Sequence, residues 1–560
     1  MRKALVPGLL LTLVAAAGVP LVPVAAQLLL AATDTPQVVR FHGGGYDRAD
    51  ALTVDGAGNA YVAGAIDSSG GSTFGVVKLS PQGSVVWTAR YNGSAGGVGG
   101  GALAVAVDGH GNVYVAGYTG DGVIFNTNID QLVVKFASNG AQQWANRYDG
   151  AARGYDQATR IAVDGGGNAY VGGFAYGENQ NQAFDWTTAK FDPAGALVWR
   201  RAHSGPGQAD DRVVDMVLAP SGRVVVTGFT KNLGDGMTND IDTLAYDPAG
   251  NVRWQARWTA APTSHETPTD LDIDAAGRVA ITGTTAENPS PYAVPSPFTL
   301  RYDAGGTLLQ SLPGVGGATV DVDAAGNTVA TGFSFVPPAT SSVTRLDASG
   351  QQTWSVPLTV TDDSALSELF VRFDPSGAVT VAATLTNVFT HAYDYLTIRF
   401  GADGGERWRH QFDGPVHGSD RVAGLEVDGT GVAWVTGTSW NNYLSLPGGT
   451  ADDIVSLRFA PGSQPALVAP SGLDARALSR SQIRLRWQDN AGTETGTRIE
   501  RCTGVGCTNF VEIATVGTNV TEHVDSNLAR NTQYTYRVRA FNAQATSQYS
   551  NTAGAKTLRR

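Results

Sequence analysis

Recurring carboxylates are the residues of this sequence that could do chemistry. A first set stands eight residues before the Asp or Ala that closes a recurring apolar run, and consists of Asp47, Asp156, Asp211, Glu266 and Asp420. A second set stands six residues before the last aromatic residue of another recurring run, and consists of Asp130, Asp185, Asp240, Asp394 and Asp453. Converging carboxylates repel one another, and a hard cation with oxygen ligands, such as Ca²⁺, offsets that repulsion. The first set is therefore a candidate ligand-binding site, and the second is a candidate calcium site.

The same acids also have a purely structural interpretation. Arginine directly follows three members of the first set, at Arg48, Arg212 and Arg421, so ion pairs are available. An Asp at the start of a strand also accepts hydrogen bonds from loop amides. Both interpretations stay open at this point.

Patterns typical of catalysis are missing from the sequence. It contains no Gly-x-Ser-x-Gly, no His-Glu-x-x-His and no phosphate-binding loop, and His265-Glu266 stands alone. The formal net charge of -11 gives no basic field for a phosphate backbone. We therefore expect neither an enzyme nor a nucleic-acid partner, and no cofactor other than calcium.

A repeat of about 50 residues organises the chain. Near-copies of GNVYVAG (111–117) begin at residues 58, 167, 222, 277, 326, 377 and 431, and this period is typical of propellers or solenoids. Each repeat contains four strand-like runs, designated A to D, which in the second repeat are 103–108, 113–117, 132–136 and 142–148. An Asp-x-x-Gly turn joins A to B, in which Gly supplies a left-handed backbone and Asp caps the turn.

Strand D of the eighth repeat is missing, because that repeat ends with its C run at 454–462. The segment QVVRFHG (37–43) precedes the first A run and carries Arg40-Phe41, the same pair as Arg147-Tyr148 in strand D of the second repeat. Donating this segment to the last repeat would close a ring and remove an open sheet edge. The sequence therefore predicts an all-β fold with a single eight-bladed β-propeller.

Two further residue types recur once in most repeats. Tryptophan stands in the D run at Trp87, Trp144, Trp199, Trp254, Trp354 and Trp408, where packing between blades is favoured over a row of sugar-stacking platforms. A basic residue stands one position before the last apolar residue of the C run, and we expect a repeated ion pair there. These residues are Lys78, Lys135, Lys190, Arg301, Arg345, Arg399 and Arg458.

The repeat resembles the bacterial β-propeller repeat family known as SBBP. The resemblance rests on RYDGAARGYDQATRIAVDGGGNAYVGGF (147–174) and KFDPAGALVW (190–199), and it covers residues 37–462. It implies a propeller at 35–462 followed by a linker at 463–469, and it says little about function. The repeat departs from its pattern at Leu309, which replaces the tryptophan.

The C-terminal residues 470–557 resemble a fibronectin type III domain. Trp487 occupies a core position of strand B, and the spacing of Leu528 and Tyr534 is similar to a tyrosine corner. The sequence has two cysteines, Cys502 and Cys507, which fit one local disulfide in an oxidising compartment, with two free thiols as the alternative.

Residues 1–26 have the pattern of a signal peptide, with Met1-Arg2-Lys3 before an apolar run and cleavage expected after residue 26 or as late as 32. An uncleaved anchor is the alternative. The sequence thus predicts an exported monomer, located extracellularly, at the cell surface or in the periplasm.

The B to C connections are long and all different, which is where a rigid scaffold usually places specificity. The A and C runs both begin at this face, so we expect the first set of acids to surround the mouth of the central channel and the second set to lie further out at the same end. They carry the aromatic residues Phe125, Phe174, Tyr176, Phe184, Tyr292, Phe335, Phe389, Tyr393, Trp440 and Tyr443. The favoured function is a secreted or cell-envelope, non-catalytic binding or adhesion module that takes a glycan or protein on this face. The alternatives are a quinoprotein-like propeller enzyme and an envelope assembly scaffold.

Overall fold

The computed structural model describes residues 36–68, 71–91, 100–120, 129–152, 154–178, 183–207, 209–232, 238–287, 295–333, 341–360, 364–387, 392–414, 417–441, 451–460, 467–491, 494–541 and 546–559. The signal-peptide prediction falls outside these residues. Within them the fold is all-β, with no helix. Accordingly, the described part of the chain contains no helix long and apolar enough to cross a membrane.

Eight antiparallel sheets of four strands follow one another along the chain, each with its strands in the order A to D. The first four sheets are β2 (Arg48–Val54), β3 (Ala60–Ser68), β4 (Gly71–Leu79) and β5 (Val85–Arg90); β6 (Gly100–Val107), β7 (Val113–Gly120), β8 (Ile129–Phe136) and β9 (Gln142–Tyr148); β10 (Gln157–Val163), β11 (Ala169–Tyr176), β12 (Phe184–Phe191) and β13 (Leu197–His203); β14 (Arg212–Leu218), β15 (Val224–Lys231), β16 (Asn239–Tyr246) and β17 (Val252–Trp258).

The other four sheets are β18 (Ser264–Ile273), β19 (Val279–Glu287), β20 (Ser296–Tyr302) and β21 (Leu308–Pro313); β22 (Val320–Val322), β23 (Thr328–Phe333), β24 (Ser341–Leu346) and β25 (Gln352–Leu358); β26 (Ser364–Phe373), β27 (Val379–Asn387), β28 (Tyr393–Phe400) and β29 (Glu406–Phe412); and β30 (Asp420–Val427), β31 (Ala433–Asn441), β32 (Ala451–Phe459) and β1 (Gln37–Phe41).

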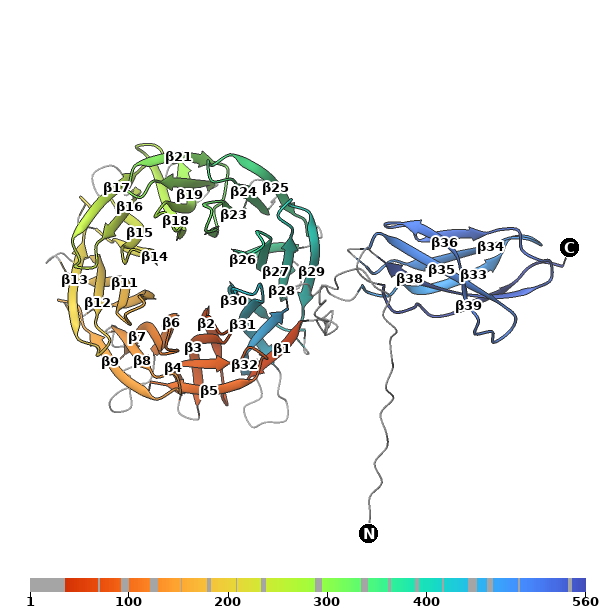
Figure 1. The fold of residues 1–560 in the computed structure, drawn as a ribbon, viewed down its shortest axis with the longest axis horizontal. Helices are drawn as coiled ribbons and strands as arrows, with labels where there is room; N and C mark the ends of the chain where they lie inside the picture. The colour runs from red at the N-terminus through yellow and green to blue at the C-terminus, as the bar shows by residue number, and fades with distance from the viewer. Residues whose placement is uncertain are drawn as a thin grey trace, which may run out of the picture.

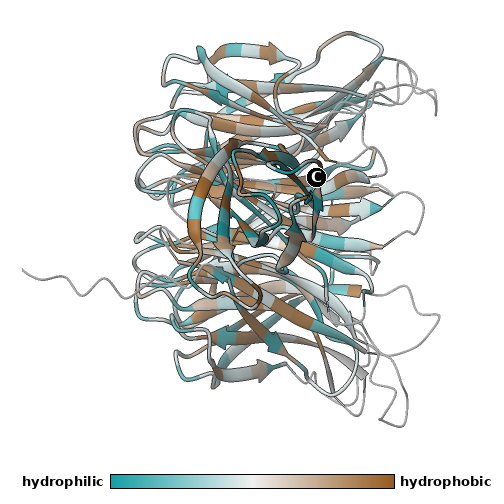
Figure 2. Ribbon diagram, turned by 90° about the vertical axis from the view of Figure 1, so that its right-hand side faces the viewer, coloured by the Kyte–Doolittle hydropathy of each residue, from teal (hydrophilic) through white to brown (hydrophobic). Residues whose placement is uncertain are grey.

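The eight sheets are arranged around a central opening, with the A strands innermost (Figure 1). Each A strand contacts the A strand of the next sheet, and β30 of the last sheet contacts β2 of the first. Apolar side chains fill the space between neighbouring sheets, as where Tyr61 and Val76 pack with Val115 and Val134. Apolar segments recur along the strands (Figure 2). The middle strands are buried on both faces, as in β8 from Asp130 to Phe136, which is expected of a sheet packed between two others.

Strand β1 completes the last sheet, as the sequence predicts. It pairs antiparallel with β32, so that Val39 lies opposite Ser456 and Phe41 opposite Ile454. Because β1 comes from the opposite end of the repeat array, the last sheet is built from both ends of it. This pairing removes an open edge at β32.

The Asp-x-x-Gly turns have the predicted geometry. In the second sheet Asp108 Oδ1 accepts hydrogen bonds from the amides of His110 and Asn112, both at 2.9 Å. Gly111 has a φ of 77°, which an L side chain rarely adopts. These short turns close one end of the sheets, and the end where the A and C strands begin carries the long connections. We call the latter the loop end.

The recurring tryptophans pack between neighbouring sheets. Trp144 Nε1 donates to the carbonyl of Pro193 at 3.2 Å in the next sheet, and its ring lies against Gly195 of the same turn. Trp199 repeats the arrangement with Pro248 and Gly250. The packing interpretation is confirmed for these positions.

The predicted repeated ion pair of the C-strand basic residues is wrong. Lys135 Nζ instead donates to the carbonyl of Pro193 and lies 4.9 Å from the ring centre of Tyr114. The turn aspartate is already occupied, because Asp108 Oδ2 accepts from the Asn112 side chain and the Tyr114 hydroxyl.

In most other repeats the basic residue of the C strand likewise contacts a ring or a carbonyl instead of the turn aspartate. Lys78 and Lys190 lie over tyrosine rings, and Arg301 and Arg345 donate to carbonyls of the next sheet. Arg399 is the exception, since it pairs with the turn residue Asp374. In that turn the Asn and Tyr are replaced by Ala378 and Thr380, which leaves Asp374 Oδ2 available to the arginine.

Residues beyond 467 form a separate pair of sheets, β33-β34-β37 and β36-β35-β38-β39. Their strands are β33 (Ser471–Ala477), β34 (Ile483–Gln488), β35 (Gly496–Thr503), β36 (Val511–Gly517), β37 (Glu522–Asp525), β38 (Gln533–Phe541) and β39 (Ala553–Lys556). Trp487 belongs to the buried core, and Tyr534 OH accepts from the amide of Ala529 at 3.0 Å, as in the predicted corner. Cys502 and Cys507 form a disulfide.

Candidate functional site

The first set of acids is fully buried at the loop end, where it binds backbone amides. Asp156 Oδ2 accepts from the amide of Gly150 at 2.5 Å, and its Oδ1 accepts from Tyr176 at 2.8 Å. Asp211 binds the amides of Gly205 and Lys231 in the same way. Each carboxylate thus joins the turn that enters the A strand to the start of the long B to C connection.

The remaining members of the first set bind similar groups. Asp420 Oδ2 accepts from the amide of Gly414 at 2.6 Å, and Asp47 accepts from Gly43. Glu266 accepts from the Ser264 and Thr285 hydroxyls and from the amide of Ala260. Capping is therefore an observed role of this set, and its ligand-binding role stays a prediction.

Burial makes ionisation of these acids costly. It raises the pKa of Asp156, Glu266 and Asp420, and it raises the pKa of Asp211 to about 6. The amide hydrogen bonds act in the opposite direction, since they favour the charged form. The loop end thus holds carboxyl groups whose ionised form would be stabilised by any added positive charge.

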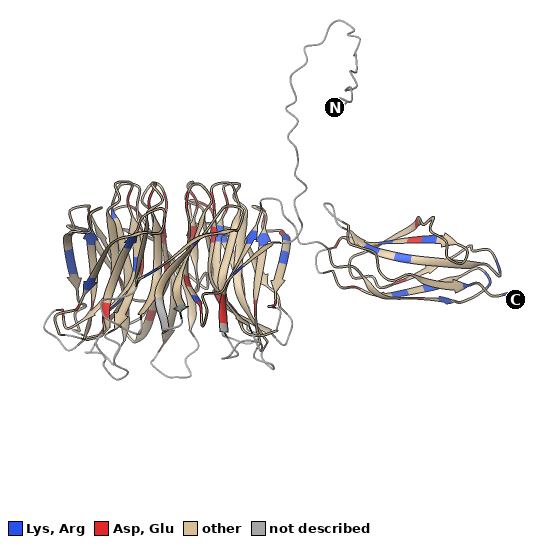
Figure 3. Ribbon diagram, turned by 90° about the horizontal axis from the view of Figure 1, so that it is seen from below, with Lys and Arg blue, Asp and Glu red and all other residues tan. Residues whose placement is uncertain are grey.

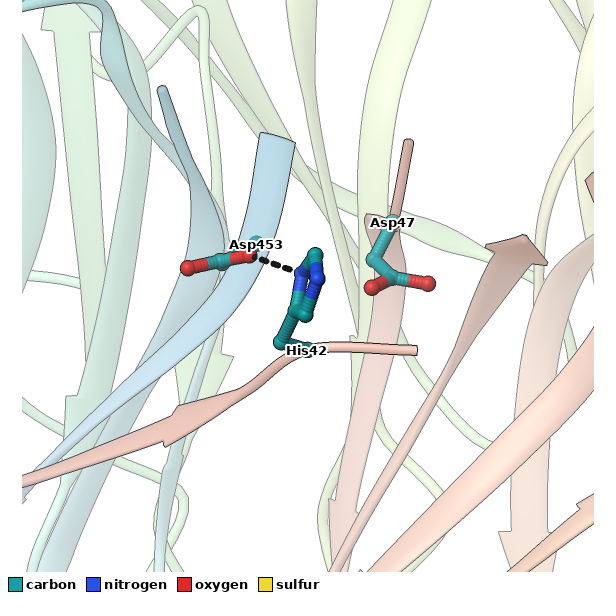
Figure 4. A group of neighbouring side chains, drawn as sticks. All are labelled: His42, Asp47 and Asp453. Atoms are coloured by element: carbon teal, nitrogen blue, oxygen red, sulfur yellow. Dashed lines mark hydrogen bonds and ion pairs between the residues drawn. The ribbon is translucent and has the colours of Figure 1, made fainter. Parts of the chain in front are cut away.

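Members of the second set bind side chains near the start of the C strands. Asp453 accepts from Arg40 at 2.9 Å and contacts His42 Nδ1 at 2.8 Å (Figure 4). Asp130 pairs with Arg147, and Asp185 accepts from Ser204. The other two members are Asp240, which accepts from Asn232 at 2.9 Å, and Asp394, which accepts from Gln411 at 2.6 Å.

The two sets meet at the junctions between neighbouring sheets. Among the described residues, three groups bring candidate ligand atoms within 4.8 Å of one another, namely His42, Asp47 and Asp453; Asp130, Asp149 and Asp156; and Asp394, Asp413 and Asp420. Each group combines a C-strand acid of one sheet with the A-strand acid of the next. In Figure 4 the three side chains come from different segments, since His42 follows β1, Asp47 precedes β2 and Asp453 lies on β32.

The third member of each group was not predicted from the sequence. His42, Asp149 and Asp413 directly follow the last aromatic residue of strand D and precede the glycine whose amide the buried acid binds. The signal that could have found them is the tripeptide at the end of strand D, which reads FHG, YDG and FDG in these three repeats. In these groups, residues of the second set lie beside residues of the first set.

A second group of charges lines the central cavity, whose volume is about 600 Å³. The cavity is lined by the A strands, and its acidic residues are Asp50, Asp215, Asp270, Asp272, Asp321 and Glu426, with Arg160 and Arg372 among them. None of the first set belongs to this lining, although we expected that set to surround the mouth of a channel. Viewed from the side, Asp and Glu occur near both edges of the sheets (Figure 3).

The cavity acids bind the inner edges of neighbouring A strands. Asp270 Oδ2 accepts from the amide of Val320 at 2.8 Å, and Asp321 Oδ2 accepts from Phe373 at 2.7 Å. The innermost strand of each sheet has an unpaired edge, so these carboxylates satisfy amides that no strand reaches. Asp272 does the same for Val322 at 2.6 Å.

Crowding of these carboxyls changes their protonation. Burial and then the charge of Asp321 raise the pKa of Asp272 to about 8. Burial and the neighbouring Asp215 raise the pKa of Asp270. The positive charge of Arg372 acts on both groups in the opposite direction and is itself paired with Glu426 at 3.2 Å.

Aromatic rings remain exposed at the loop end. Tyr46 is 56 % exposed, and Tyr155 and Trp440 are each 37 % exposed. Tyr155 stacks on Phe174 with the ring centres 6.2 Å apart, and Arg212 lies 4.8 Å above the same Phe174 ring. Of the predicted loop aromatics, Phe125, Tyr292, Phe335, Phe389 and Tyr443 lie outside the described residues.

Comparison with known proteins identifies the C-terminal sheets. The fibronectin type III domain family matches residues 468–554, and no curated protein matches the chain. A solved Fn3-like protein from Clostridium thermocellum is 28 % identical over 16 % of this chain and 91 % of that one, with a TM-score of 0.15.

Two other solved structures are similar over a comparable share of the chain. A myokine structure is 23 % identical over 17 % of this chain and all of that one, with a TM-score of 0.15. A structure of titin kinase and its flanking domains is 23 % identical over 16 % of this chain and 17 % of that one, with the same TM-score. Residues 468–554 are a fibronectin type III domain.

Proposed function

We propose that the eight sheets form a single eight-bladed β-propeller of the SBBP type, which β1 closes. The support is the ladder between β1 and β32, the contact between β30 and β2, and the ring seen in Figure 1. A closed ring leaves only short, protected sheet edges, which suits a stable scaffold outside the cell.

We further propose that the protein is an exported, non-catalytic binding module whose loop end takes a glycan or protein ligand. The observation that carries this proposal is the exposure of three large rings, Tyr46, Tyr155 and Trp440, at that end. Rings left in water are apolar platforms for sugar faces or for apolar side chains of a partner.

Cations beside the rings strengthen this assignment. Arg212 lies over Phe174, and Arg421 lies 4.1 Å above the ring centre of Tyr393. Both arginines directly follow a buried acid of the first set, which holds the start of their strand in place. Rings and guanidinium groups on rigid strands lose little conformational freedom when a ligand binds.

The alternative of an enzyme has less support. The carboxylates of the central cavity are engaged with backbone amides or with arginine, as in the 2.6 Å pair of Arg160 and Asp215. An acid that holds two sheets together cannot also move protons without loosening that contact. We therefore favour a binding module over a propeller enzyme.

The test is a glycan array together with affinity capture from exported proteins and surface polysaccharides, using the full chain. Tyr155→Ala and Trp440→Ala together should weaken binding of any hit at least about tenfold, because each ring supplies apolar contact area. Val198→Ala, which trims a side chain 53 % exposed on an outer strand, is the matched control and should leave binding unchanged. Equal loss in both variants would contradict the assignment of the loop end.

A further inference from the structure

The three junction groups differ in how their negative charge is balanced. At the junction of the last and first sheets, Asp453 binds both Arg40 and His42. At the junction of the second and third sheets, Asp130 binds Arg147, which occupies the same place in the repeat as Arg40. Positive side chains of the protein therefore partly neutralise the carboxylates at these two junctions.

The junction of the seventh and eighth sheets lacks this arginine. Gln411 takes its place, and its neutral amide donates to Asp394 Oδ2 at 2.6 Å. Three carboxylates, Asp394, Asp413 and Asp420, meet there with ligand atoms within 4.8 Å of one another. Arg40 of the adjacent β1 is bound to Asp453 and to Ser439, so its guanidinium is already engaged.

One oxygen at this junction has no hydrogen bond of ordinary geometry, although the Ser439 hydroxyl acts on the same carboxylate. The Asp420 side chain is completely buried, and its Oδ1 finds no hydrogen-bond partner among the described residues, although Oδ2 binds the amide of Gly414. A buried carboxylate oxygen without a donor costs free energy, which a cation recovers. His417 pairs with Asp413 at this junction, so the positive side chain bound to this group is an exposed imidazole rather than a guanidinium.

We propose that Asp394, Asp413 and Asp420 bind one Ca²⁺ ion at the junction of the seventh and eighth sheets. Calcium lies about 2.4 Å from each oxygen ligand, so ligand atoms on opposite sides of the ion are separated by about 4.8 Å. The spacing of this group meets that limit. Asp413 is exposed and would admit water to complete the coordination, while the buried Asp420 supplies the fixed ligand.

The site joins strands β28, β29 and β30, so calcium would hold two neighbouring sheets together. Asp394 lies on β28, Asp413 directly follows β29, and Asp420 begins β30. This role is independent of which ligand the loop end takes. The dissociation constant should be about 10⁻⁴ to 10⁻³ M, the range of extracellular calcium modules with few charged ligands.

The test is a calorimetric titration of the chelator-treated full chain with calcium chloride, accompanied by thermal melting. Wild type should bind one ion and melt at a higher temperature with calcium present. Asp413→Asn should abolish both effects while leaving the melting temperature without calcium unchanged, because the residue is exposed. The exchange Gln411→Arg, which restores the arginine of the other junctions, should also abolish calcium binding.

A matched control is Asp149→Asn, the same change at the junction that already has Arg147. It should retain the heat and the shift in melting temperature. Absence of heat and of any shift in the wild-type protein would overturn the proposal. Undiminished calcium binding by Asp413→Asn would equally overturn it.

Discussion

Arg40 of β1 donates to Asp453 of β32 at 2.9 Å, across 413 positions of the chain. This contact fixes the only strand of the eight described sheets that comes from the other end of the repeat array. The same strand buries Val39, which is 8 % exposed, and leaves Val38 48 % exposed.

We expect Val39→Asp to destabilise the ring, because it places a charge in the core between the last and first sheets. The free energy of unfolding should fall by at least about 2 kcal/mol. Val38→Asp adds the same charge on the solvent face and should change it by no more than about 0.5 kcal/mol. Chemical denaturation of both variants provides the comparison, and equal losses would argue against the observed register of β1.

The packing of tryptophan on the turn of the next sheet can be tested at Gly195. Its φ is 88°, and a Cβ there would lie 2.8 Å from the ring of Trp144. Gly195→Ala should therefore destabilise through both backbone strain and a clash. Gly314→Ala is the matched control, since its φ is 81° but a Cβ would meet no atom within 4 Å.

The clash alone should make Gly195→Ala at least about 1 kcal/mol more destabilising than Gly314→Ala. Denaturant titrations give both values. If the two changes cost the same, the tryptophan does not pack against this turn.

The cavity acids predict a dependence of stability on pH. The pKa of Asp272 rises from 3.8 to about 8 on folding, so the folded state favours its neutral form. The resulting stability is complete below about pH 4 and is lost as the pH rises through about 8. Melting of the ring should therefore occur at a lower temperature at pH 8.5 than at pH 5.

Asp272→Asn should flatten this dependence, because an amide oxygen still accepts from Val322 but carries no charge. Asp321→Asn should lessen it, since burial is the main cause of the raised pKa of Asp272 and the charge of Asp321 adds to it. If stability depends on pH as steeply in both variants as in wild type, then Asp272 and Asp321 are not the cause of the dependence.

The disulfide should stabilise the fibronectin type III domain alone. Cys502 and Cys507 are five positions apart, so the bond constrains little chain entropy. Replacing both by serine should lower the stability of this domain by no more than about 3 kcal/mol and leave the melt of the ring unchanged. Calorimetry with two resolved transitions checks this, and a shift of the ring transition would contradict it.

Much of the fold could be predicted because the repeat displays its own strand order. The four runs of the second repeat became β6 to β9, and QVVRFHG became β1. Periodicity and turn residues are local signals, so they can be recognised in a sequence without any knowledge of packing. The C-strand basic residues were misassigned because their partner depends on whether Asn and Tyr already occupy the turn aspartate, as they do at Asp108.

The site was less predictable, because its contacts lie between repeats. The sequence placed both sets of acids at one end, but not that Asp394 of one sheet would lie beside Asp420 of the next. Asp272, Asp321 and Glu426 were missed because the equivalent position holds Thr53, Ala106, Ala162 and Val217 in the first four repeats. A position that changes from apolar to charged between repeats carries no periodic signal.

The role of the loop end is tested most directly by hydrogen exchange on the full chain, with and without the glycan or protein selected by the screen. Binding at the loop end predicts slower exchange around Tyr46, Tyr155 and Trp440, where the strands β2, β10 and β31 meet that end. The Asp-x-x-Gly turns at the other end of the sheets should exchange as in the free protein. Protection confined to those turns, or to the fibronectin type III domain, would contradict the account.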